Sequence, residues 1–587
     1  MQTSSNVLSP SSIVGVILHD RPLISECHKQ EREIVKIEQQ PSQQESNKPK
    51  RQFNTLVNNP VLEDYSLRYA PRSFRKWSEY AVATAALGGI AYLADFAIGG
   101  SIAVTHGFTS AFWAILAAGV VIFLTGIPIS YYSAKYNIDM DLLTRGAGFG
   151  YFGSTITSLI YASFTFIFFS LEGSIMAQAM NVYFGLPLWL TYLISALMII
   201  PLVVFGMTLL SKLQVWTQPI WLILLVAPFL AILFKDPAAF VNFTHFAGTS
   251  PTGAGFNYLA FGLGAGVALS LIAQIGEQVD YLRFMPDKTP ANSKRWWAAV
   301  LSAGPGWIIL GVLKQLGGAF LAFYIFTDSG AKLAVEPIHQ LIKGFGVLVP
   351  NQFLVVTLAT FFVVLSQVKI NVTNAYSGSL SWSNFFSRVL YWHPGRVVWL
   401  FFNVGVALLL MELGVFGFLN TVLGFYSNVA IAWIGAVVAD LVINKPLLKL
   451  SPSYIEFKRA HLYNINPVGF GSMVIASLIS VAAFFGLFGE VAQAYSPFLA
   501  IGIAFVLSPI MAIITKGKYY MAREDIPVFV AENGNLPVLT CTVCAQEYEA
   551  PDMSDCPYHG GSICSLCCTL EKNCHDMCKH VAVGHAL

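Results

Sequence analysis

The sequence predicts an all-α polytopic membrane protein, and three observations support this fold class. Of the 587 residues, 55% are hydrophobic and only 11% are charged, whereas soluble globular proteins carry about 25% charged residues. Apolar runs of about 20 residues, the length of a membrane-spanning helix, recur between Trp77 and Thr515. These runs lack the short alternating pattern of about ten residues that marks a transmembrane β-barrel.

Composition divides the chain into three regions. Residues 1–75 are polar and include the run QQPSQQESNKPKR, so we expect a disordered N-terminal tail. Residues 76–517 form the predicted transmembrane domain. It contains twelve apolar segments, at 79–104, 111–132, 150–181, 187–206, 214–234, 256–281, 297–326, 352–383, 397–414, 418–443, 467–489 and 496–515. Residues 520–587 hold eight of the nine cysteines and form a separate small domain.

The loop charges predict the orientation. Lys and Arg gather in alternate loops, among them those with Arg145, Arg283 and Lys445, and basic residues are retained on the cytoplasmic side. We therefore expect a multi-pass protein of the cell (plasma or inner) membrane with both termini in the cytoplasm, no cleavable signal and no disulfides. The net charge of +2 offers no broad basic surface, so nucleic acid is not an expected partner.

Polar residues inside two apolar segments are the first candidates for a binding site. The third segment contains Glu172, and the eighth contains Gln367, Lys369, Asn371 and Asn374. Such groups cost several kcal/mol in a bilayer unless they are paired or face a wet cavity. Gln367, Asn371 and Asn374 share one helical stripe, which predicts a substrate pathway. The alternative is that they only join helices through hydrogen bonds.

Glycines interrupt the first and sixth segments. Gly88 and Gly89 lie in the first, and Gly264 and Gly266 in the sixth. Unwound backbone at membrane depth is tolerated where it lines a cavity, and a pair of interrupted helices at matching positions marks the binding site of inverted-repeat transporters. Close helix packing through small residues is the alternative.

Further charged groups lie in the apolar segments. Asp95 lies deep in the first segment, whereas Glu277 and Asp280 lie near the end of the sixth, where Asp280 is followed by Arg283. A helix-end ion pair is an alternative for Asp280. Lys314 in the seventh segment has no partner that the sequence identifies.

Three stretches resemble the nucleobase-cation symporter family, which includes purine-cytosine permeases. They are DYLRFMP at 280–286, NVTNAYS at 371–377 and RGAGFGYFGS at 145–154. The resemblance implies two inverted repeats of five helices with helices 1 and 6 broken, two extra helices, and alternating access to a central site. It implies substrate contacts from helices 3, 6 and 8, namely Phe168, Glu172, Gln274, Gln367, Asn371, Asn374 and Tyr376. A flat heterocycle would stack on Phe168 or Tyr376 and bond the polar groups through its edge.

The resemblance also bears on the coupling ion. Sodium-coupled relatives carry small hydroxyl residues near the position of Lys369, and an ammonium there would repel a sodium ion. We therefore expect a proton in preference to sodium. Lys369 and Glu172 would form a proton-responsive pair, with Asp95 as a further coupling residue.

The C-terminal cysteines have the spacing of zinc ligands. They form four pairs, namely Cys541 with Cys544, Cys556 with His559, Cys564 with Cys567, and Cys574 with Cys578. Short pairs of this kind predict two structural zinc ions, the first and third pairs binding one and the second and fourth binding the other. Cys568 could replace His559. An iron–sulfur cluster is the competing cofactor, and reduced buried cysteines are the remaining alternative.

Two functions follow as hypotheses. The first is a secondary transporter that imports a purine- or pyrimidine-like heterocycle with a proton. The second is a membrane sensor that reports substrate binding through the cysteine-rich domain to a cytoplasmic signalling partner. No hydrolytic triad, phosphate-binding loop or kinase motif occurs in the sequence, so we do not expect an enzyme.

Overall fold

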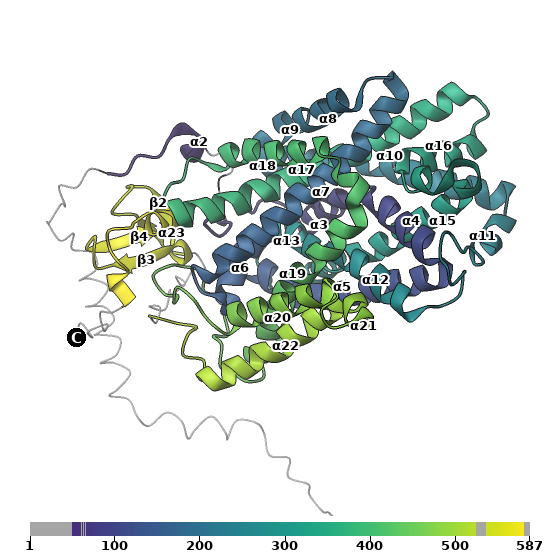
Figure 1. Ribbon diagram of the computed structural model, residues 1–587. Coiled ribbons are helices and arrows are strands. Elements are labelled where there is room, and N and C mark those ends of the chain that lie inside the picture. Colours follow the sequence, from purple (N-terminus) through teal and green to yellow (C-terminus); the bar gives the residue numbers. More distant parts are fainter. Residues whose placement is uncertain (1–49, 60–61, 63, 65, 524–535, 580–587) are drawn as a thin grey trace, which may run out of the picture. The chain divides into compact units, whose positions relative to one another are not determined.

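The computed structural model describes residues 50–59, 62, 64, 66–523 and 536–579. Every one of the twelve predicted apolar segments is helical there (Figure 1). In this part of the chain, eight helices are long and apolar enough to cross a membrane, and a bent pair brings the number of spans to as many as nine. Shorter helices cover the other predicted segments. The protein is therefore a multi-pass membrane protein.

The first five predicted segments correspond to a bent helix, three long spans and one pair of shorter helices. Their helices are α3 (Glu79–Gly88), α4 (Ala94–His106), α5 (Phe108–Tyr136), α7 (Gly153–Phe184), α8 (Leu188–Leu197), α9 (Ile200–Val204) and α10 (Gly206–Lys235). The short elements between them are η3 (Gly89–Ala91), α6 (Met140–Thr144) and η4 (Arg145–Phe149), and α11 (Ala238–Phe243) follows α10.

The remaining segments follow in the same way. Their helices are α12 (Tyr258–Leu269), α13 (Gln274–Leu282), α14 (Ser293–Ala303), α15 (Trp307–Ala334), α16 (Pro337–Leu348), α17 (Gln352–Leu390), α18 (Arg396–Glu412), α19 (Leu419–Ala439), α20 (Gly469–Phe484), α21 (Glu490–Ala494) and α22 (Ser496–Thr515). The connecting turns are η5 (Ser270–Ala273), η6 (Val415–Phe418) and η7 (Asp440–Asn444).

Side-chain caps set where several of these helices begin. The hydroxyl of Ser78 accepts from the N–H of Ala81 at the start of α3, and the amide oxygen of Asn257 does the same for Ala260 in α12. Asn351 caps α17 through the N–H of Leu354. Each cap satisfies an N–H that has no partner within its own helix.

Two pairs of helices form the centre of the bundle. The most extensive helix contacts join α7 to α17 and α4 to α15. Glycines allow the second pair to touch: a Cβ on Gly99 would lie 1.8 Å from the carbonyl oxygen of Gln315, and one on Gly318 would lie 2.3 Å from the Cα of Phe96. Two backbones can approach this closely only where side chains are missing.

The sixth span is interrupted at a different place from the one that its glycines predict. Gly264 and Gly266 lie within the regular helix α12, where they face Ile102 and Pro497. The interruption is the 3₁₀ turn η5, which contains no glycine. In the sixth span the glycines thus serve close packing, the alternative that their sequence left open.

The cysteine-rich region has its own small core. It contains β1 (Val538–Thr540) paired antiparallel with β2 (Glu547–Glu549), and β3 (Met553–Cys556) paired antiparallel with β4 (Gly561–Cys564), together with η8 (Ala550–Asp552), α23 (Ser565–Thr569) and η9 (Met577–Lys579). Its buried cluster combines five cysteines with apolar side chains such as Ile563, Leu566 and Leu570.

Parts of the chain before the first span pack against this core. Leu67 is buried in it, and Phe53 and Val57, the latter in α2 (Thr55–Asn58), lie against it. The sequence predicts disorder for residues 1–75, but the described residues between 51 and 75 form contacts because their few apolar side chains cover the cysteine core. Residues 1–49 lie outside the described residues.

Candidate functional site

The break in the first span lies next to Gly88 and Gly89, as their positions predict. Helix α3 ends at Gly88, η3 follows, and α4 begins at Ala94 with its axis bent by 48° from the preceding segment. A Cβ on Gly88 would lie 2.5 Å from the Cβ of Gln214, so only glycine fits there. The break releases backbone groups within the membrane domain, and these need partners.

Helices α7 and α17 supply partners for the released N–H groups. The carboxylate of Glu172 on α7 accepts from the N–H of Ala94, at 3.3 and 3.2 Å from its two oxygens. The amide oxygen of Gln367 on α17 accepts from the N–H of Leu93 at 3.4 Å. A carboxylate at a helix N-terminus also complements the helix dipole. The structure therefore brings Glu172, Gln367 and the helix break together, as the sequence predicted.

Lys314 supplies the partner for the released carbonyl groups. Its ammonium, reaching from α15, donates to the carbonyl oxygens of Ile90 (2.6 Å) and Tyr92 (2.9 Å). It also lies 2.9 Å from the carboxylate of Asp95, whose other oxygen accepts from Gln315 at 2.9 Å. Lys314 and Asp95 are both buried. The sequence identifies no partner for Lys314, because its partners lie in a distant segment.

Lys369 faces a different helix from the one expected. Its ammonium donates to the carbonyl oxygen of Gln214 (3.1 Å) and to the hydroxyl of Thr217 (2.9 Å), both on α10. The described residues show no ion pair between Lys369 and Glu172. The proposed pair of these two residues is therefore wrong in this conformation. The reason is side-chain direction: Lys369 lies two positions from both Gln367 and Asn371 and so points away from their stripe.

The polar stripe of α17 turns toward α7. Asn371 donates to the carbonyl oxygen of Phe169 at 3.3 Å, and Asn374 donates to the side-chain oxygen of Asn371 at 3.1 Å. All of the stripe is buried, and two of its atoms, Gln367 Nε2 and Asn374 Oδ1, have no hydrogen-bond partner among the described residues. Buried atoms of this kind are rare in proteins and call for a bound solute or water.

Helix α13, the second half of the sixth span, adds a second group of buried polar residues. Gln274, at the start of α13, donates to one carboxylate oxygen of Glu277 at 2.7 Å. The other oxygen of Glu277 and the side chain of Gln278 have no hydrogen-bond partner within the described part of the chain. Their position just after η5 places them beside the interruption of the sixth span. The sequence predicts a position near a helix end for Glu277 and does not mark Gln278 as a candidate site residue.

The two expected aromatic contacts differ in their surroundings. Phe168 is buried one turn before Glu172 and packs on Phe164, with ring centroids 4.5 Å apart. Tyr376 instead accepts a hydrogen bond from Arg283 at 2.8 Å, and the guanidinium of Arg396 lies 4.9 Å from its ring centre. Phe168 thus remains beside Glu172, whereas Tyr376 belongs to a charged network at the end of the bundle.

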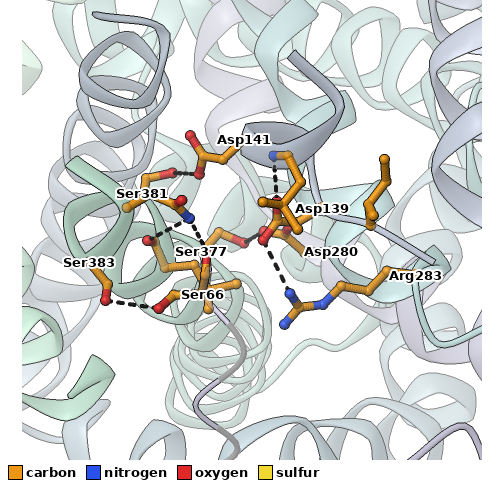
Figure 2. Close-up of polar contacts among 12 residues, drawn as sticks. Ser66, Asp139, Asp141, Asp280, Arg283, Ser377, Ser381 and Ser383 are labelled. Atoms are coloured by element: carbon orange, nitrogen blue, oxygen red, sulfur yellow. Dashed lines mark hydrogen bonds and ion pairs between the residues drawn. The ribbon is translucent and has the colours of Figure 1, made fainter. Parts of the chain in front are cut away.

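That network joins α7, α13 and α17 near their ends (Figure 2). The carboxylate of Asp280 accepts from the hydroxyls of Ser377 (2.6 Å) and Tyr161 (2.9 Å). Arg283 pairs with Asp139 at 3.2 Å, and Ser381 donates to Asp141 at 2.9 Å. The sequence left a helix-end pair of Asp280 with Arg283 as an alternative, and the structure gives each of them partners on other elements. In this conformation the network binds these helix ends to one another.

The cysteine-rich region contains one compact group of metal-ligand atoms. The four sulfurs of Cys541, Cys544, Cys564 and Cys567 all lie within 4.8 Å of one another and are buried. The N–H groups of Cys564 and Cys567 point at the sulfurs of Cys541 and Cys564, each at 3.4 Å. This group can hold a metal ion. It unites the first and third pairs, as the spacing predicted.

The second predicted metal group is arranged differently. His559 lies 3.1 Å from the carboxylate of Glu571 through its Nε2 atom. Cys556, Cys574 and Cys578 line one cavity together with Cys568. His580 and His585 lie outside the described residues.

Comparison with solved structures identifies the fold. A structure of Mhp1, described as a nucleobase-cation-symport-1 family transporter in a closed conformation with bromovinylhydantoin bound, matches with a TM-score of 0.57 and 17% identity over 78% of this chain and 99% of that one. The inward-facing conformation of Mhp1 matches with a TM-score of 0.51 and 16% identity, covering 81% of this chain and 100% of that one.

A third structure extends the comparison. The substrate-bound outward-open state of a Na⁺-coupled sialic acid symporter matches with a TM-score of 0.53 and 14% identity over 77% of this chain and 93% of that one. No protein-family model and no curated protein matches the sequence. The protein therefore has the fold of these symporters, and the fold predicted for its transmembrane domain is confirmed.

Proposed function

We propose that the protein is a secondary transporter that imports a flat heterocycle of the purine, pyrimidine or hydantoin class by alternating access. One observation carries the proposal: within the described residues, buried polar atoms on Gln367, Asn374 and Glu277 have no hydrogen-bond partner, and they lie on the helices that flank the break of the first span and the turn η5. A heterocycle with donors and acceptors along its edge satisfies such atoms. The fold supports the same class, since Mhp1 was solved with a hydantoin bound.

The helix-end network supports alternating access. The network includes Asp280 in α13, Arg283 just after it and Tyr376 in α17. The loop charges predict that this end of the bundle faces the cytoplasm. The contacts of these three residues with Asp139, Ser377 and one another close that side here. Opening the cytoplasmic path requires these charge-assisted bonds to break and the freed groups to become hydrated.

The charge balance of the site supports proton coupling. Three carboxyl groups of the site are buried, those of Asp95, Glu172 and Glu277. Lys314 forms an ion pair with Asp95. Three ionised carboxylates against one ammonium would leave two uncompensated charges in the membrane domain, at a cost of several kcal/mol each. Protons on Glu172 and Glu277 remove that cost. We therefore propose that these two carboxyl groups carry the coupled proton.

Lys314 supports a mechanism without sodium. In transporters with broken helices, the released carbonyl oxygens are the usual ligands of the coupling cation. Here the carbonyl oxygens of Ile90 and Tyr92 bind the ammonium of Lys314. The ammonium of Lys314, a cation attached to the protein, thus binds the carbonyl oxygens at the break of the first span in place of a sodium ion.

Uptake by proteoliposomes tests the proposal. The purified protein is first screened for thermal stabilisation by purines, pyrimidines, hydantoins and amino acids. The radiolabelled form of the best ligand is then offered to proteoliposomes under an inward proton gradient, and separately under an inward sodium gradient. We expect accumulation with the proton gradient alone. Binding without accumulation under either gradient contradicts the transporter.

A membrane sensor is the second candidate function, and the contacts of the cysteine-rich region favour it. The hydroxyl of Tyr151, just before α7, donates to Thr569 at 2.9 Å, and Arg459 bonds the carbonyl oxygen of Cys568 at 2.8 Å. The helix that carries Glu172 is thus joined to the region that would bind a signalling partner. A sensor would bind ligand in the same screen and show no turnover.

We further propose zinc for the cluster of Cys541, Cys544, Cys564 and Cys567. Four buried thiolates form the closed tetrahedral set of a structural zinc site. The loop charges that predict a cytoplasmic position for the network predict the same side for both termini.

A further inference from the structure

Four cysteines outside the first cluster line one small cavity. Cys556 ends β3, Cys568 lies in α23, and Cys574 and Cys578 belong to the last described turns. All four line one cavity of about 10 Å³. That volume is about the space that one water-sized species occupies.

The surroundings of these cysteines differ from an apolar core. The same cavity is lined by Arg459, Glu571 and Asp576, and Cys568, Cys574 and Cys578 are only partly buried. Reduced cysteines behave as small apolar side chains and would favour apolar neighbours. Four thiols that line one cavity among charged side chains instead match the ligand types of a soft or borderline divalent cation.

His559 does not line this cavity, whereas Cys568 does. Its Nε2 atom lies 3.1 Å from Glu571, so one ring nitrogen already has a carboxylate partner. The N–H of His559 donates to the carbonyl oxygen of Cys556 at 3.2 Å, which closes the Cys556-x2-His559 turn. Glu571, the partner of the imidazole, lines the cavity itself.

Arginines compensate the charge of both centres. A divalent cation with four thiolates carries a net charge of −2. Arg68 interacts electrostatically with Cys564 in the first cluster, and Arg459 with Cys568 and Cys574 in the second. Arg459 also bonds the carbonyl oxygen of Cys568 at 2.8 Å and the carboxylate of Asp576 at 2.9 Å. Each centre thus has a buried or partly buried guanidinium beside it.

We propose that Cys556, Cys568, Cys574 and Cys578 bind a second zinc ion, with Cys568 as a ligand and His559 outside the ligand set. Helix α23 then bridges two ions, because Cys567 binds the first and its neighbour Cys568 binds the second. The second ion also joins the cysteine-rich region to the membrane domain. Asp576, between Cys574 and Cys578, pairs with Arg459 of the membrane domain at 2.9 Å.

Metal analysis of matched variants tests the ligand set. The full-length protein is purified without chelator, and zinc and iron are counted per chain by mass spectrometry. We expect two zinc ions in the unchanged protein and in His559→Ala, and one in Cys568→Ser and in Cys541→Ser. Two zinc ions retained in Cys568→Ser, or one lost in His559→Ala, overturns the ligand set. Iron in the unchanged protein overturns the choice of metal.

X-ray absorption covers the case in which a variant loses its fold and both ions. At the zinc edge, the unchanged protein should show about four sulfur neighbours per zinc at about 2.3 Å. The scattering pattern of an imidazole ring would instead place a histidine in the second centre and overturn the proposal. Neither measurement depends on transport, so its outcome is separate from that of the proposed function.

Discussion

The ammonium of Lys314 lies 2.9 Å from the carboxylate of Asp95 within the membrane domain, and both side chains are buried. This pair joins α15 to α4, the helix that follows the break of the first span. The same ammonium bonds the carbonyl oxygens of Ile90 and Tyr92. One side chain therefore satisfies the backbone released by the break and balances the nearest carboxylate.

Removal of one member of this pair should destabilise the protein strongly. Lys314→Met leaves the carboxylate of Asp95 buried without its cation, which costs about 3–5 kcal/mol. The double variant Lys314→Met with Asp95→Asn should recover part of that loss. Thermal unfolding in detergent measures both. Lys369→Met is the matched control, since Lys369 bonds only uncharged groups of α10, and an equal loss there would contradict the assignment.

A small cation should replace the missing ammonium. In Lys314→Ala the carbonyl oxygens of Ile90 and Tyr92 and the carboxylate of Asp95 are left as cation ligands. Added sodium or methylammonium should therefore raise the unfolding temperature of this variant and leave that of the unchanged protein as it is. Adding Asp95→Asn should abolish the gain. Stabilisation of the unchanged protein by sodium would refute a tethered cation at this site.

The pH dependence of uptake should depend on Glu172. Glu172→Gln keeps an oxygen that can accept from the N–H of Ala94, but the amide cannot take up a proton. We expect accumulation driven by the proton gradient to fall at least about tenfold, which corresponds to about 1.4 kcal/mol, while substrate still exchanges across the membrane. Lys369→Thr serves as the comparison. If both variants keep the pH dependence of the unchanged protein, Glu172 does not carry the proton.

The close contact of α4 with α15 should tolerate no side chain at Gly99. Gly99→Ala would place a methyl group 1.8 Å from the carbonyl oxygen of Gln315, so the helices must separate. Overpacking of this kind costs about 1–3 kcal/mol or more. Gly405→Ala is the control, because no atom lies within 4 Å of its added Cβ. Equal unfolding temperatures of the two variants would contradict the packing seen here.

Acid should weaken the contact between the N-terminal segment and α18. Burial alone would raise the pKa of Asp64, but the charge of His393 and hydrogen bonds from His393 and the Arg396 N–H lower this pKa from 3.8 to about 2. The contribution is therefore present above pH 4 and is lost as the pH falls toward 2, by about 2 kcal/mol in total. Unfolding temperatures of the unchanged protein and Asp64→Asn should differ at pH 5 and converge as the pH falls from 4 toward 2. A constant difference would show that the carboxylate contributes nothing.

The sequence by itself determined the helical class, the twelve apolar segments, the break at Gly88 and Gly89, and the meeting of Glu172 with Gln367. It also determined the first cysteine cluster. These features follow from local properties: the length of an apolar run, the lack of a Cβ, the spacing along one helix face, and short turns that present two thiolates.

Only the tertiary structure decided which distant groups meet. Lys314 found its carbonyl and carboxylate partners on the first span, Lys369 turned to α10, and Tyr376 joined Arg283. In the cysteine-rich region, Cys568 lies at the second centre and His559 pairs with Glu571. The reason is that a buried charge or donor takes whichever partner helix packing brings within about 3 Å, and that packing depends on surfaces far apart in the chain.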